Sequence, residues 1–379
     1  MKIIIVGPIY PYKGGIAHHT GLLAANLSKE YDVEVISFKM LYPSFLYKKT
    51  QKDYENNAFE YKNIKYLINT VNPISYIKTG RYIKKQKPDL IIFQWWHPYF
   101  APAYWTILKV IKKIKVIFIC HNVLPHEKFP FQKKITKTVL SKGGQIVHSD
   151  TEANELINLI KTPIYAQTVL PIFDLFSKIC NYQKKDARNH LLLNESDRVL
   201  LFFGFIREYK GLKHLIKAMP DIIKQYPECI LLIVGDYFEG NKEEYLLLID
   251  DIEMQKNIKI FDGYIPDSEV GLYFSACDIV VLPYESATQS GIVQIAYGFN
   301  KPVIATKVGG LPDVVVDKKT GYLIPPCDSR AVTEAVKQFF EKGDINFFNE
   351  NIITEKYKYS WDRMTEIILV LYNKLQLGR

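Results

Sequence analysis

Cysteine is scarce in this chain, and its spacing offers no cysteine-bound metal site. The five cysteines of the 379 residues stand apart from one another, at Cys120, Cys180, Cys229, Cys277 and Cys327. They form no C-x-x-C pair or other metal-ligand spacing, which suits a reducing cytosol. Two of them, Cys120 and Cys277, lie in apolar, strand-like runs, where a small buried thiol is expected rather than a reactive one.

Long apolar runs are also missing from the sequence. No stretch reaches the roughly 20 continuous apolar residues that are needed to cross a bilayer. The first residues, MKIIIVGPIYP, predict a short strand and a turn, without the long apolar segment and small-residue cleavage site of a signal peptide. We therefore expect a cytoplasmic protein, either soluble or peripheral at the cytoplasmic face of a membrane.

Acidic residues are outnumbered by basic ones, 40 to 49, which gives a formal net charge of +9. The excess lies in the first half, at residues 47–49 and 81–85 and at Lys109, Lys112, Lys113 and Lys115. The last cluster follows an aromatic segment, residues 103–108, and together they predict a basic amphipathic helix. Two interpretations of this helix stay open: contact with a membrane surface, or a solvated face whose other side packs on a sheet. A nucleic-acid partner is not expected, because the basic residues match no known nucleic-acid-binding module.

Short, apolar, β-branched segments alternate with helical patterns along most of the chain. The first series of predicted strands comprises residues 2–7, 33–38, 89–95, 115–120 and 145–149. The pattern pauses near residues 171–197 and restarts with a second series, at 199–205, 229–235, 258–264, 278–284, 302–306 and 321–326. Such segments are typical of parallel sheets covered by helices on both faces. The predicted fold class is therefore α/β, with two Rossmann-like domains.

The pause sets the predicted domain boundaries at residues 1–172 and 173–357, followed by a final helical segment, residues 358–379. Ligands of such sheets bind beyond the carboxyl ends of the strands, so two facing domains would enclose a ligand in the cleft between them. The final helix is amphipathic and is expected to tie the domains together. Its apolar side chains are Trp361, Met364, Ile367, Ile368, Val370 and Leu371.

One strand, turn and helix, residues 278–310, predict a phosphate-binding unit. The turn SATQSG, residues 286–291, supplies hydroxyls and backbone N–H groups where a helix opens. The unpaired N–H groups and the positive end of the helix dipole favour an anion at this position. An ordinary strand-to-helix connection has the same form, so the neighbouring segments must decide between the two interpretations.

Two other segments follow strand ends. Gly14 and Gly15 precede a helix and would let a ligand approach the backbone, although the dinucleotide fingerprint G-x-G-x-x-G is absent and a structural turn fits equally well. Arg207 and Lys210 follow the strand at 199–205 and could neutralise a diphosphate leaving group. The alternative is a pair of surface cations, which a nearby helix start disfavours unless an anion is present.

A third strand end carries His121, which could hydrogen-bond a sugar hydroxyl or donate a proton to a substrate oxygen. His126 and Glu127 follow it in the same loop. A metal site is not expected here, because the remaining histidines, such as His97 and His148, are dispersed along the sequence and show no ligand spacing.

Taken together and in order, these segments resemble the retaining GT-B glycosyltransferases of family 4, the glycosyl transferases group 1. No single landmark is decisive, and their joint order and spacing over nearly the whole chain carry the resemblance. The landmarks are KGG (13–15), HNVLPHE (121–127), FGFIREYKGL (203–212), IVGDY (233–237), FDGYIPDSEVGLYFSACDIVVLPY (261–284), KPVIATKVGGLPDVV (301–315) and TGYLIPP (320–326).

The resemblance implies transfer of a sugar from a nucleotide-sugar donor to a saccharide or lipid-linked saccharide acceptor, with retention at the anomeric carbon. Such a hexosyltransferase-type enzyme requires no metal and no cofactor beyond its co-substrate. The first domain would bind the acceptor and the second the donor. A role in cell-envelope polysaccharide biosynthesis would suit the basic, aromatic first domain.

The same resemblance implies the site residues. Arg207 and Lys210 would contact the diphosphate, and His121 would lie near the donor sugar. Gly14 and Gly15 would approach the diphosphate from the first domain. The other predicted binding residues would border the phosphates, the base and the ribose: Gly263, Tyr264, Thr288, Gln289, Ser290, Gly291 and Gln294.

The chain departs from the family at two glutamates that the family commonly carries in this region. Counted back from Pro302, their positions hold Ala287 and Ile295. Glu285 and Gln294 lie nearby, and a shifted register could use them, although a shift of one residue turns a side chain to another face of a helix. The turn SATQSG is therefore expected to act through backbone N–H groups, hydroxyls and Gln289.

Two other functions stay open on the sequence. A nucleotide-sugar epimerase of the same architecture would need similar donor contacts, and it would isomerise the donor without an acceptor. A non-catalytic nucleotide or lipid-headgroup binding protein would account for the missing glutamates, and it would bind a nucleotide diphosphate without turnover.

Overall fold

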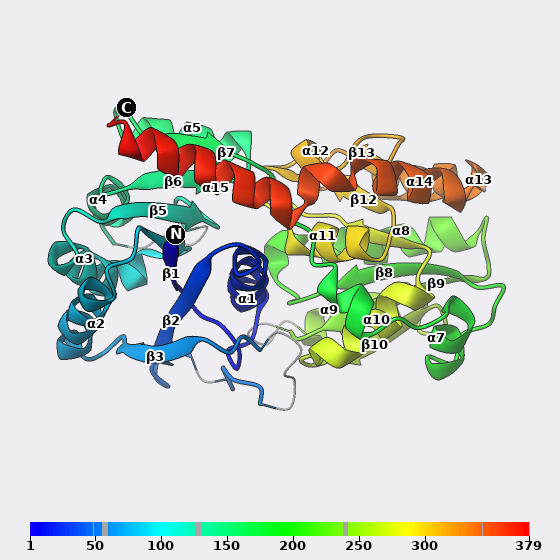
Figure 1. Ribbon diagram of the computed structural model, residues 1–379. Coiled ribbons are helices and arrows are strands. Elements are labelled where there is room, and N and C mark those ends of the chain that lie inside the picture. The colour runs from blue at the N-terminus through cyan, green and yellow to red at the C-terminus, as the bar shows by residue number, and fades with distance from the viewer. Residues whose placement is uncertain (48, 55–59, 126–129, 238–241, 343, 379) are drawn as a thin grey trace. The chain divides into compact units, whose positions relative to one another are not determined.

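The computed structural model describes residues 1–47, 49–54, 60–125, 130–237, 242–342 and 344–378. The chain divides into two compact units (Figure 1). Unit 1 comprises Met1–Pro171 and Ser360–Arg379, and unit 2 comprises Ile172–Tyr359. Each unit is built on one parallel sheet, which confirms the predicted α/β class with two Rossmann-like domains.

The sheet of unit 1 has seven strands in the order β3-β2-β1-β4-β5-β6-β7, and its neighbours pair in parallel. The strand order reverses between β1 and β4, and in open α/β sheets ligands bind beyond the carboxyl ends of the strands at such a switch point. The strands are β1 (Lys2–Val6), β2 (Asp32–Met40), β3 (Ile64–Asn69), β4 (Leu90–Trp95), β5 (Lys115–Cys120), β6 (Gly144–Val147) and β7 (Tyr165–Gln167).

Helices cover both faces of this sheet, because its central strands are apolar on both sides. In β1, Ile3 and Ile5 enter one core and Ile4 and Val6 enter the other, as the alternation of side chains along a strand requires. The helices are α1 (Gly15–Leu27), α2 (Pro73–Gln86), η1 (Pro98–Phe100), α3 (Ala101–Val110), α4 (Gln132–Leu140), α5 (Asp150–Leu159) and α15 (Trp361–Gln376).

The last helix, α15, returns to unit 1, where it packs against α1, β5 and β6. Met364, Ile368 and Leu371 are buried, as their spacing predicts. Val370 is 50% exposed, so its predicted role in packing is wrong, because it lies on the opposite face of the helix. The predicted packing of this helix across both domains stays a prediction.

The sheet of unit 2 has six strands in the order β10-β9-β8-β11-β12-β13, again parallel, and its order reverses between β8 and β11. The strands are β8 (Arg198–Phe203), β9 (Cys229–Gly235), β10 (Ile258–Asp262), β11 (Ile279–Leu282), β12 (Val303–Thr306) and β13 (Gly321–Ile324). The helices are α6 (Leu175–Ile179), α7 (Lys184–His190), η2 (Glu208–Lys210), α8 (Leu212–Ile223), α9 (Lys242–Asp251), α10 (Asp267–Ala276), α11 (Gly291–Gly298), α12 (Leu311–Val314), α13 (Ser329–Lys342), α14 (Ile345–Glu355) and η3 (Lys356–Tyr359).

Among the elements of unit 1 that were not predicted from the sequence are β3, α2 and β7. Both missed strands lie at the edges of the sheet, where side chains are only partly buried. The helix α2 buries four residues of its fourteen and is otherwise polar and basic. These elements lack the continuous apolar runs that revealed the central strands.

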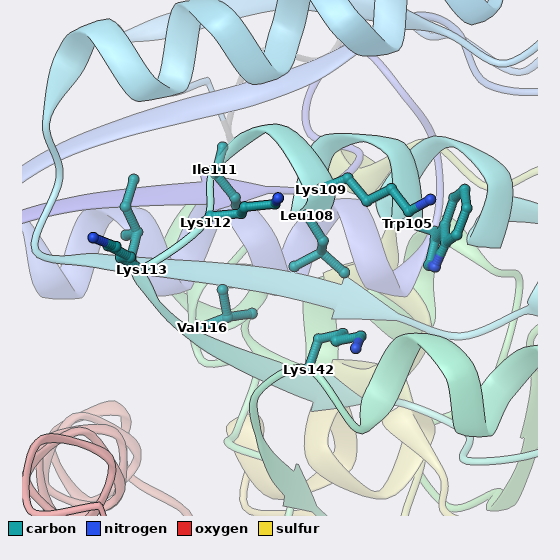
Figure 2. Close-up of a pocket in the computed structure, with 9 residues that line it drawn as sticks. Trp105, Leu108, Lys109, Ile111, Lys112, Lys113, Val116 and Lys142 are labelled. Carbon is teal, nitrogen blue, oxygen red and sulfur yellow. The ribbon is translucent and has the colours of Figure 1, made fainter.

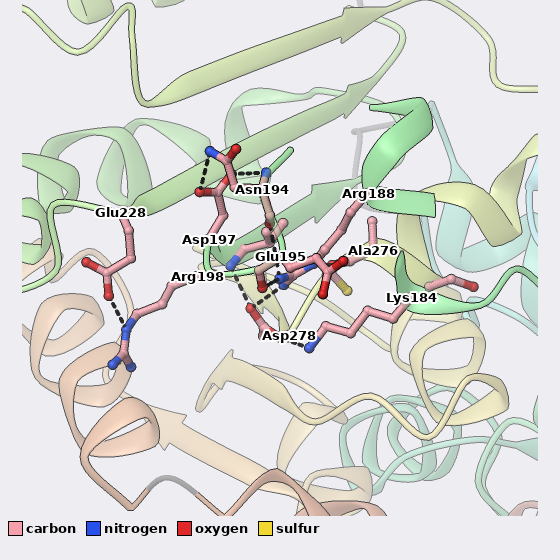
Figure 3. A network of polar contacts seen from close by, with 12 residues as sticks. Lys184, Arg188, Asn194, Glu195, Asp197, Arg198, Glu228, Ala276 and Asp278 are labelled. Carbon is pink, nitrogen blue, oxygen red and sulfur yellow. Dashed lines mark hydrogen bonds and ion pairs between the residues drawn. The ribbon is translucent and has the colours of Figure 1, made fainter. Parts of the chain in front are cut away.

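A buried ion pair fastens the amino ends of β8 and β11 (Figure 3). Arg188 on α7 donates from Nη2 to Asp278 Oδ2 at 3.0 Å, and both side chains are almost fully buried. The backbone N–H of Val199 donates to the same oxygen at 2.7 Å, and Lys184 Nζ lies 2.6 Å from Oδ1. The carboxylate of Asp278 therefore holds α7 and the first residues of both strands together.

No helix in the described ranges is both long and apolar enough to cross a membrane.

Candidate functional site

Gly204 follows β8 directly, at the switch point of the unit 2 sheet. Its φ of +101° lies in a region that favours glycine. A Cβ atom at this position would lie 3.3 Å from both Lys210 Nζ and Ile292 Cδ1. The loop after β8 and the first turn of α11 therefore meet at Gly204, where a larger residue would crowd both.

The side chain of Lys210 is buried at this meeting point, with 9% of its surface exposed. Its Nζ atom lies 5.7 Å from the centroid of the Tyr284 ring, and within the described residues no carboxylate pairs with it. Burial, followed by the positive charge of Arg207, lowers the pKa of Lys210 from 10.5 to about 7. A buried ammonium group without a counterion is costly, so this corner of unit 2 favours a bound anion.

The start of α11 lies in the same corner. Ser290 caps the helix, because its Oγ accepts a hydrogen bond from the Ile292 backbone at 3.3 Å. The Tyr284 hydroxyl lies 3.5 Å from the same Oγ. The first turn of α11 contains no acidic residue. Lys210, Tyr284, Ser290 and the adjoining Gly291 thus gather positive charge and hydrogen-bond donors at one point.

The turn before α11 is held by the double glycine of residues 309–310. The backbone N–H of Gly310 donates to the Thr288 carbonyl at 2.8 Å. Gly309 has a φ of +51°, and a Cβ atom there would lie only 1.6 Å from the Ala287 carbonyl oxygen. Only glycine permits this approach. Thr288 is buried and Gln289 is half-buried in the resulting turn.

Gln294 lies one turn inside α11 and is 1% exposed. Its Oε1 atom has no hydrogen-bond partner among the residues that the structure describes. An unpaired buried amide oxygen is unfavourable and needs a donor, such as a hydroxyl group or a water molecule. Ile295, at one of the two positions where the family commonly has glutamate, is buried and apolar.

Glu285 is already engaged within unit 2. Its Oε1 atom lies 2.8 Å from Lys213 Nζ and 2.9 Å from His214 Nε2. The hydrogen bond from Lys213 holds the pKa of Glu285 below its usual value. His214, Glu285 and Cys327 place ligand-type atoms within 4.8 Å of one another, but the Glu285 carboxylate is already paired with the ammonium group of Lys213. We therefore assign Glu285 to positioning the loop.

Gly263 and Tyr264 follow β10, the edge strand of the unit 2 sheet. Gly263 has a φ of +119°, and the space where its Cβ would point is open. The side chain of Tyr264 is half-buried. These residues are separated from β8 by β9, so they lie at the outer side of the sheet relative to Lys210.

Gly14, Gly15 and His121 belong to unit 1. Gly14 has a φ of +101° and precedes α1, and the space around both glycines is open, so that the backbone at the helix start is accessible. His121 follows β5, its backbone N–H donates to the Trp95 carbonyl at 2.8 Å, and its Nε2 lies 2.6 Å from Gln94 Oε1. With that amide orientation, Nε2 carries the proton and donates to Gln94.

His121 is one of three buried histidines that lie far apart in the sequence and close together in the structure. Its ring centroid lies 4.7 Å from that of His19 on α1 and 6.0 Å from that of His148 after β6. Burial lowers the pKa of His121 to about 3 and that of His148 to about 4, and it holds the pKa of His19 well below its usual value. All three imidazoles are therefore neutral near pH 7.

The sequence did contain a signal for part of this cluster. His121 and His148 each follow a strand, and β5 and β6 are neighbours in the sheet. Since the carboxyl ends of neighbouring parallel strands lie side by side, residues at those positions are brought together. His126 and Glu127, which were also singled out in this loop, lie outside the described residues.

The predicted site residues thus form two groups. Unit 2 brings Lys210, Ser290 and Gly291 together, with Thr288 in the adjoining turn, and unit 1 carries Gly14 and Gly15 at the start of the helix that places His19 against His121. Lys210 and Gly14–Gly15 follow β8 and β1, which border the switch points where open α/β sheets bind ligands, whereas His121 follows β5, one strand further along the sheet.

Two family models match the chain, and both describe glycosyltransferases. Residues 183–358 match the glycosyl transferases group 1, and residues 40–170 match the starch synthase catalytic domain. An uncharacterized glycosyltransferase of Methanocaldococcus jannaschii is 22% identical over 98% of both chains. A D-inositol 3-phosphate glycosyltransferase of Corynebacterium jeikeium is 26% identical over 61% of this chain and 57% of its own.

Solved structures show the same architecture. The sucrose-phosphate synthase of Thermosynechococcus elongatus has a TM-score of 0.76 and 18% identity over the whole of both chains. The Anabaena protein HepE, crystallised with UDP and glucose, has a TM-score of 0.73 and 16% identity over 100% of this chain and 99% of its own. The two-sheet fold, the family matches and the order of the landmarks agree: the chain has the GT-B fold, and its residues 183–358 belong to the group 1 glycosyltransferases.

Proposed function

We propose that this protein transfers a hexosyl group from a nucleoside-diphosphate sugar to a hydroxyl group of a saccharide or lipid-linked saccharide, with retention of the anomeric configuration. The observation that carries the proposal is the buried ammonium group of Lys210, which lies beside the start of α11 without a carboxylate partner in the described part of the chain. A diphosphate would supply the missing negative charge. We place the reaction in the cytoplasm, in the synthesis of a cell-envelope polysaccharide.

In the proposed reaction, unit 2 contributes electrostatic stabilisation of the leaving group. As the bond between the sugar and the diphosphate breaks, negative charge develops on the leaving oxygen. In this proposal Lys210, Arg207 and the N–H groups at the start of α11 would stabilise that charge as it develops. Two cations and a helix start can supply the neutralisation that a metal ion supplies elsewhere, so we propose transfer without a required metal or cofactor.

The remaining predicted residues are assigned by their surroundings. Gln294 has an unpaired oxygen inside α11, which suits a hydroxyl donor such as that of a ribose. Thr288 and Gln289 would border the phosphates, and Gly263 and Tyr264 the base. In unit 1, neutral His121 would hydrogen-bond the donor sugar, and the open backbone at Gly14 and Gly15 would face the diphosphate.

The proposal is tested first by binding and then by turnover. HepE was crystallised with UDP-glucose, so that nucleotide sugar is the first probe. A ligand at about 100 times its dissociation constant should add about 2.7 kcal/mol to the stability of the protein. With an active donor and an acceptor pool, NMR of the product should show the donor's anomeric configuration. Absence of binding across a full panel of nucleotide sugars would overturn the proposal.

A donor-only incubation separates transfer from isomerisation. We expect the nucleotide sugar to keep its configuration when no acceptor is present. An isomerised sugar would instead identify an epimerase. Binding of a nucleotide diphosphate with no turnover against any acceptor would identify a non-catalytic binding protein.

Binding of the donor should weaken as the pH rises above 7. The pKa of Lys210 is about 7 in the free protein, and a bound diphosphate favours the charged form, so binding above this pH requires uptake of a proton. We expect the dissociation constant of UDP-glucose to rise by up to about tenfold per pH unit above 7 and to be flat below about 6. Calorimetric titrations of UDP-glucose binding, at one pH below 6 and at several pH values above 7, measure this slope.

Lys210→Arg is the control, because a guanidinium stays charged throughout this range. Its affinity for UDP-glucose should be nearly independent of pH above 7. The same slope in this variant as in the wild type would assign the pH dependence to another group.

A further inference from the structure

A cavity of about 520 Å³ opens beside α3 in unit 1 (Figure 2). Its inner wall is apolar and comes from the end of α3, the following loop and β5. Leu108 and Ile114 line it and are half-buried, whereas Ile111 and Val116 are fully buried beneath them. Trp105 stands at one side, as Figure 2 shows. The cavity thus offers apolar surface to a ligand from solvent.

Four lysines surround this apolar wall: Lys109, Lys112, Lys113 and Lys142. All four are exposed, and within the described residues none forms an ion pair with a carboxylate. Lys109 places its ammonium group 3.4 Å from the centroid of the Trp105 ring. The cavity therefore combines an apolar interior with a rim of positive charge.

The sequence around the cavity is basic over a long stretch. Residues 90–149 contain nine lysines, no arginine and one acidic residue, Glu127. Three of these lysines, Lys133, Lys134 and Lys137, are exposed on α4, which packs against α3. Lysines that serve only solubility are usually interspersed with acidic residues, whereas residues 90–149 contain almost none.

The cavity lies at the end of the unit 1 sheet that is opposite to His121. Its loop, residues 111–114, leads into the first residue of β5, and Lys142 precedes the first residue of β6. His121 follows the last residue of β5, and six residues of strand separate the two ends by about 17 Å. A ligand in the cavity would therefore be distinct from the substrates of the proposed reaction.

We propose that this cavity binds an anionic phospholipid, and that the binding docks unit 1 on a membrane surface. The lysine rim is complementary in charge to the phosphate of the headgroup. The apolar wall formed by Leu108 and Ile114 can contact the upper part of an acyl chain. A soluble polyanion would use the rim and leave the apolar wall in water. The proposal concerns binding only, so it stands or falls independently of the proposed glycosyl transfer.

Sedimentation with vesicles tests the docking. The wild-type chain should bind vesicles that contain phosphatidylglycerol and should bind pure phosphatidylcholine vesicles at least about tenfold more weakly, because each lysine near an anionic surface contributes several-fold to partitioning. Lys109→Glu/Lys112→Glu should lose at least about tenfold in partitioning to the anionic vesicles. The matched control is Lys318→Glu/Lys319→Glu in unit 2, which makes the same change in net charge at two exposed lysines and should stay within about twofold of the wild type.

Equal losses in the two double variants would show that net charge alone drives binding and would overturn the proposal. So would equal binding to the neutral vesicles, or displacement by millimolar inorganic phosphate, which would indicate a site for a small soluble anion.

A second measurement tests contact between the acyl chain and the cavity directly and does not depend on charge reversal. Phosphatidylglycerol brominated along the acyl chain should quench the tryptophan fluorescence of the wild-type chain on the vesicle. Trp105→Phe should lose most of this quenching while keeping its circular dichroism spectrum. Unchanged quenching in that variant would place the membrane contact elsewhere on the chain and would contradict the assignment of this cavity.

Discussion

Lys210→Met is expected to lower kcat/KM for the nucleotide-sugar donor by about 10²–10³-fold, or about 2.7–4 kcal/mol of transition-state stabilisation. Methionine fills a similar volume, so the packing around Gly204 and Tyr284 should survive the change. What is lost is a buried positive charge that is already in place when the diphosphate departs. In a buried site such a charge is poorly screened by water, which makes its removal costly. Arg207 is more exposed than Lys210, and Arg207→Ala should lower kcat/KM for the donor at least about tenfold.

Initial rates at varied donor concentration measure both effects. A loss that falls mainly on kcat would assign Lys210 to the transition state, whereas a loss confined to KM would assign it to donor binding. Lys217→Met on the exposed side of α8 is the matched control and should keep the wild-type rate. Wild-type rates in both Lys210→Met and Arg207→Ala would remove these residues from the reaction.

The central strands and the loops that follow them could be predicted from the sequence, because both carry strong local signals. In the described residues, eleven of the thirteen strands were found as short apolar runs, and most of these are buried on both faces, which requires continuous apolar sequence. A ligand loop at a switch point needs cations, glycines or helix caps directly after such a strand. Lys210 and Ser290 could therefore be singled out before their positions in space were known.

The edge elements and the contacts between distant residues could not be predicted in the same way. Since edge strands such as β3 are only partly buried, their sequences are mixed. The pairing of Glu285 with Lys213 joins the loop after β11 to the first turn of α8, far away in the chain, and no local sequence pattern indicates it. The same is true of His19 on α1, which contacts His121 after β5 only through the tertiary fold. A tryptophan from α15, Trp361, completes that cluster, 5.1 Å from the ring of His19.

Asp278→Ala is expected to destabilise unit 2 by about 3–5 kcal/mol. The carboxylate is 5% exposed and accepts hydrogen bonds from Arg188, Lys184 and the Val199 backbone. Its removal leaves the guanidinium group of Arg188, 3% exposed, with backbone carbonyls as its only acceptors among the described residues. An uncompensated buried charge costs far more than the net contribution of the intact pair, so breaking the pair is more damaging than its strength suggests.

Amide hydrogen exchange in peptides from β8 and β11 measures this loss in unit 2 alone, which matters because a chain of two units need not unfold in one step. Exchange of their slowest amides should become about 10²–10⁴-fold faster in Asp278→Ala. The control lies in the same network (Figure 3), where Glu228 pairs with Arg198 and both side chains are about one third exposed. Glu228→Gln should change stability by no more than about 1 kcal/mol, because solvent screens that pair. Similar exchange rates in the two variants would mean that the buried Asp278 carboxylate contributes no more than a surface ion pair, and that α7 is held to the sheet by its apolar contacts instead.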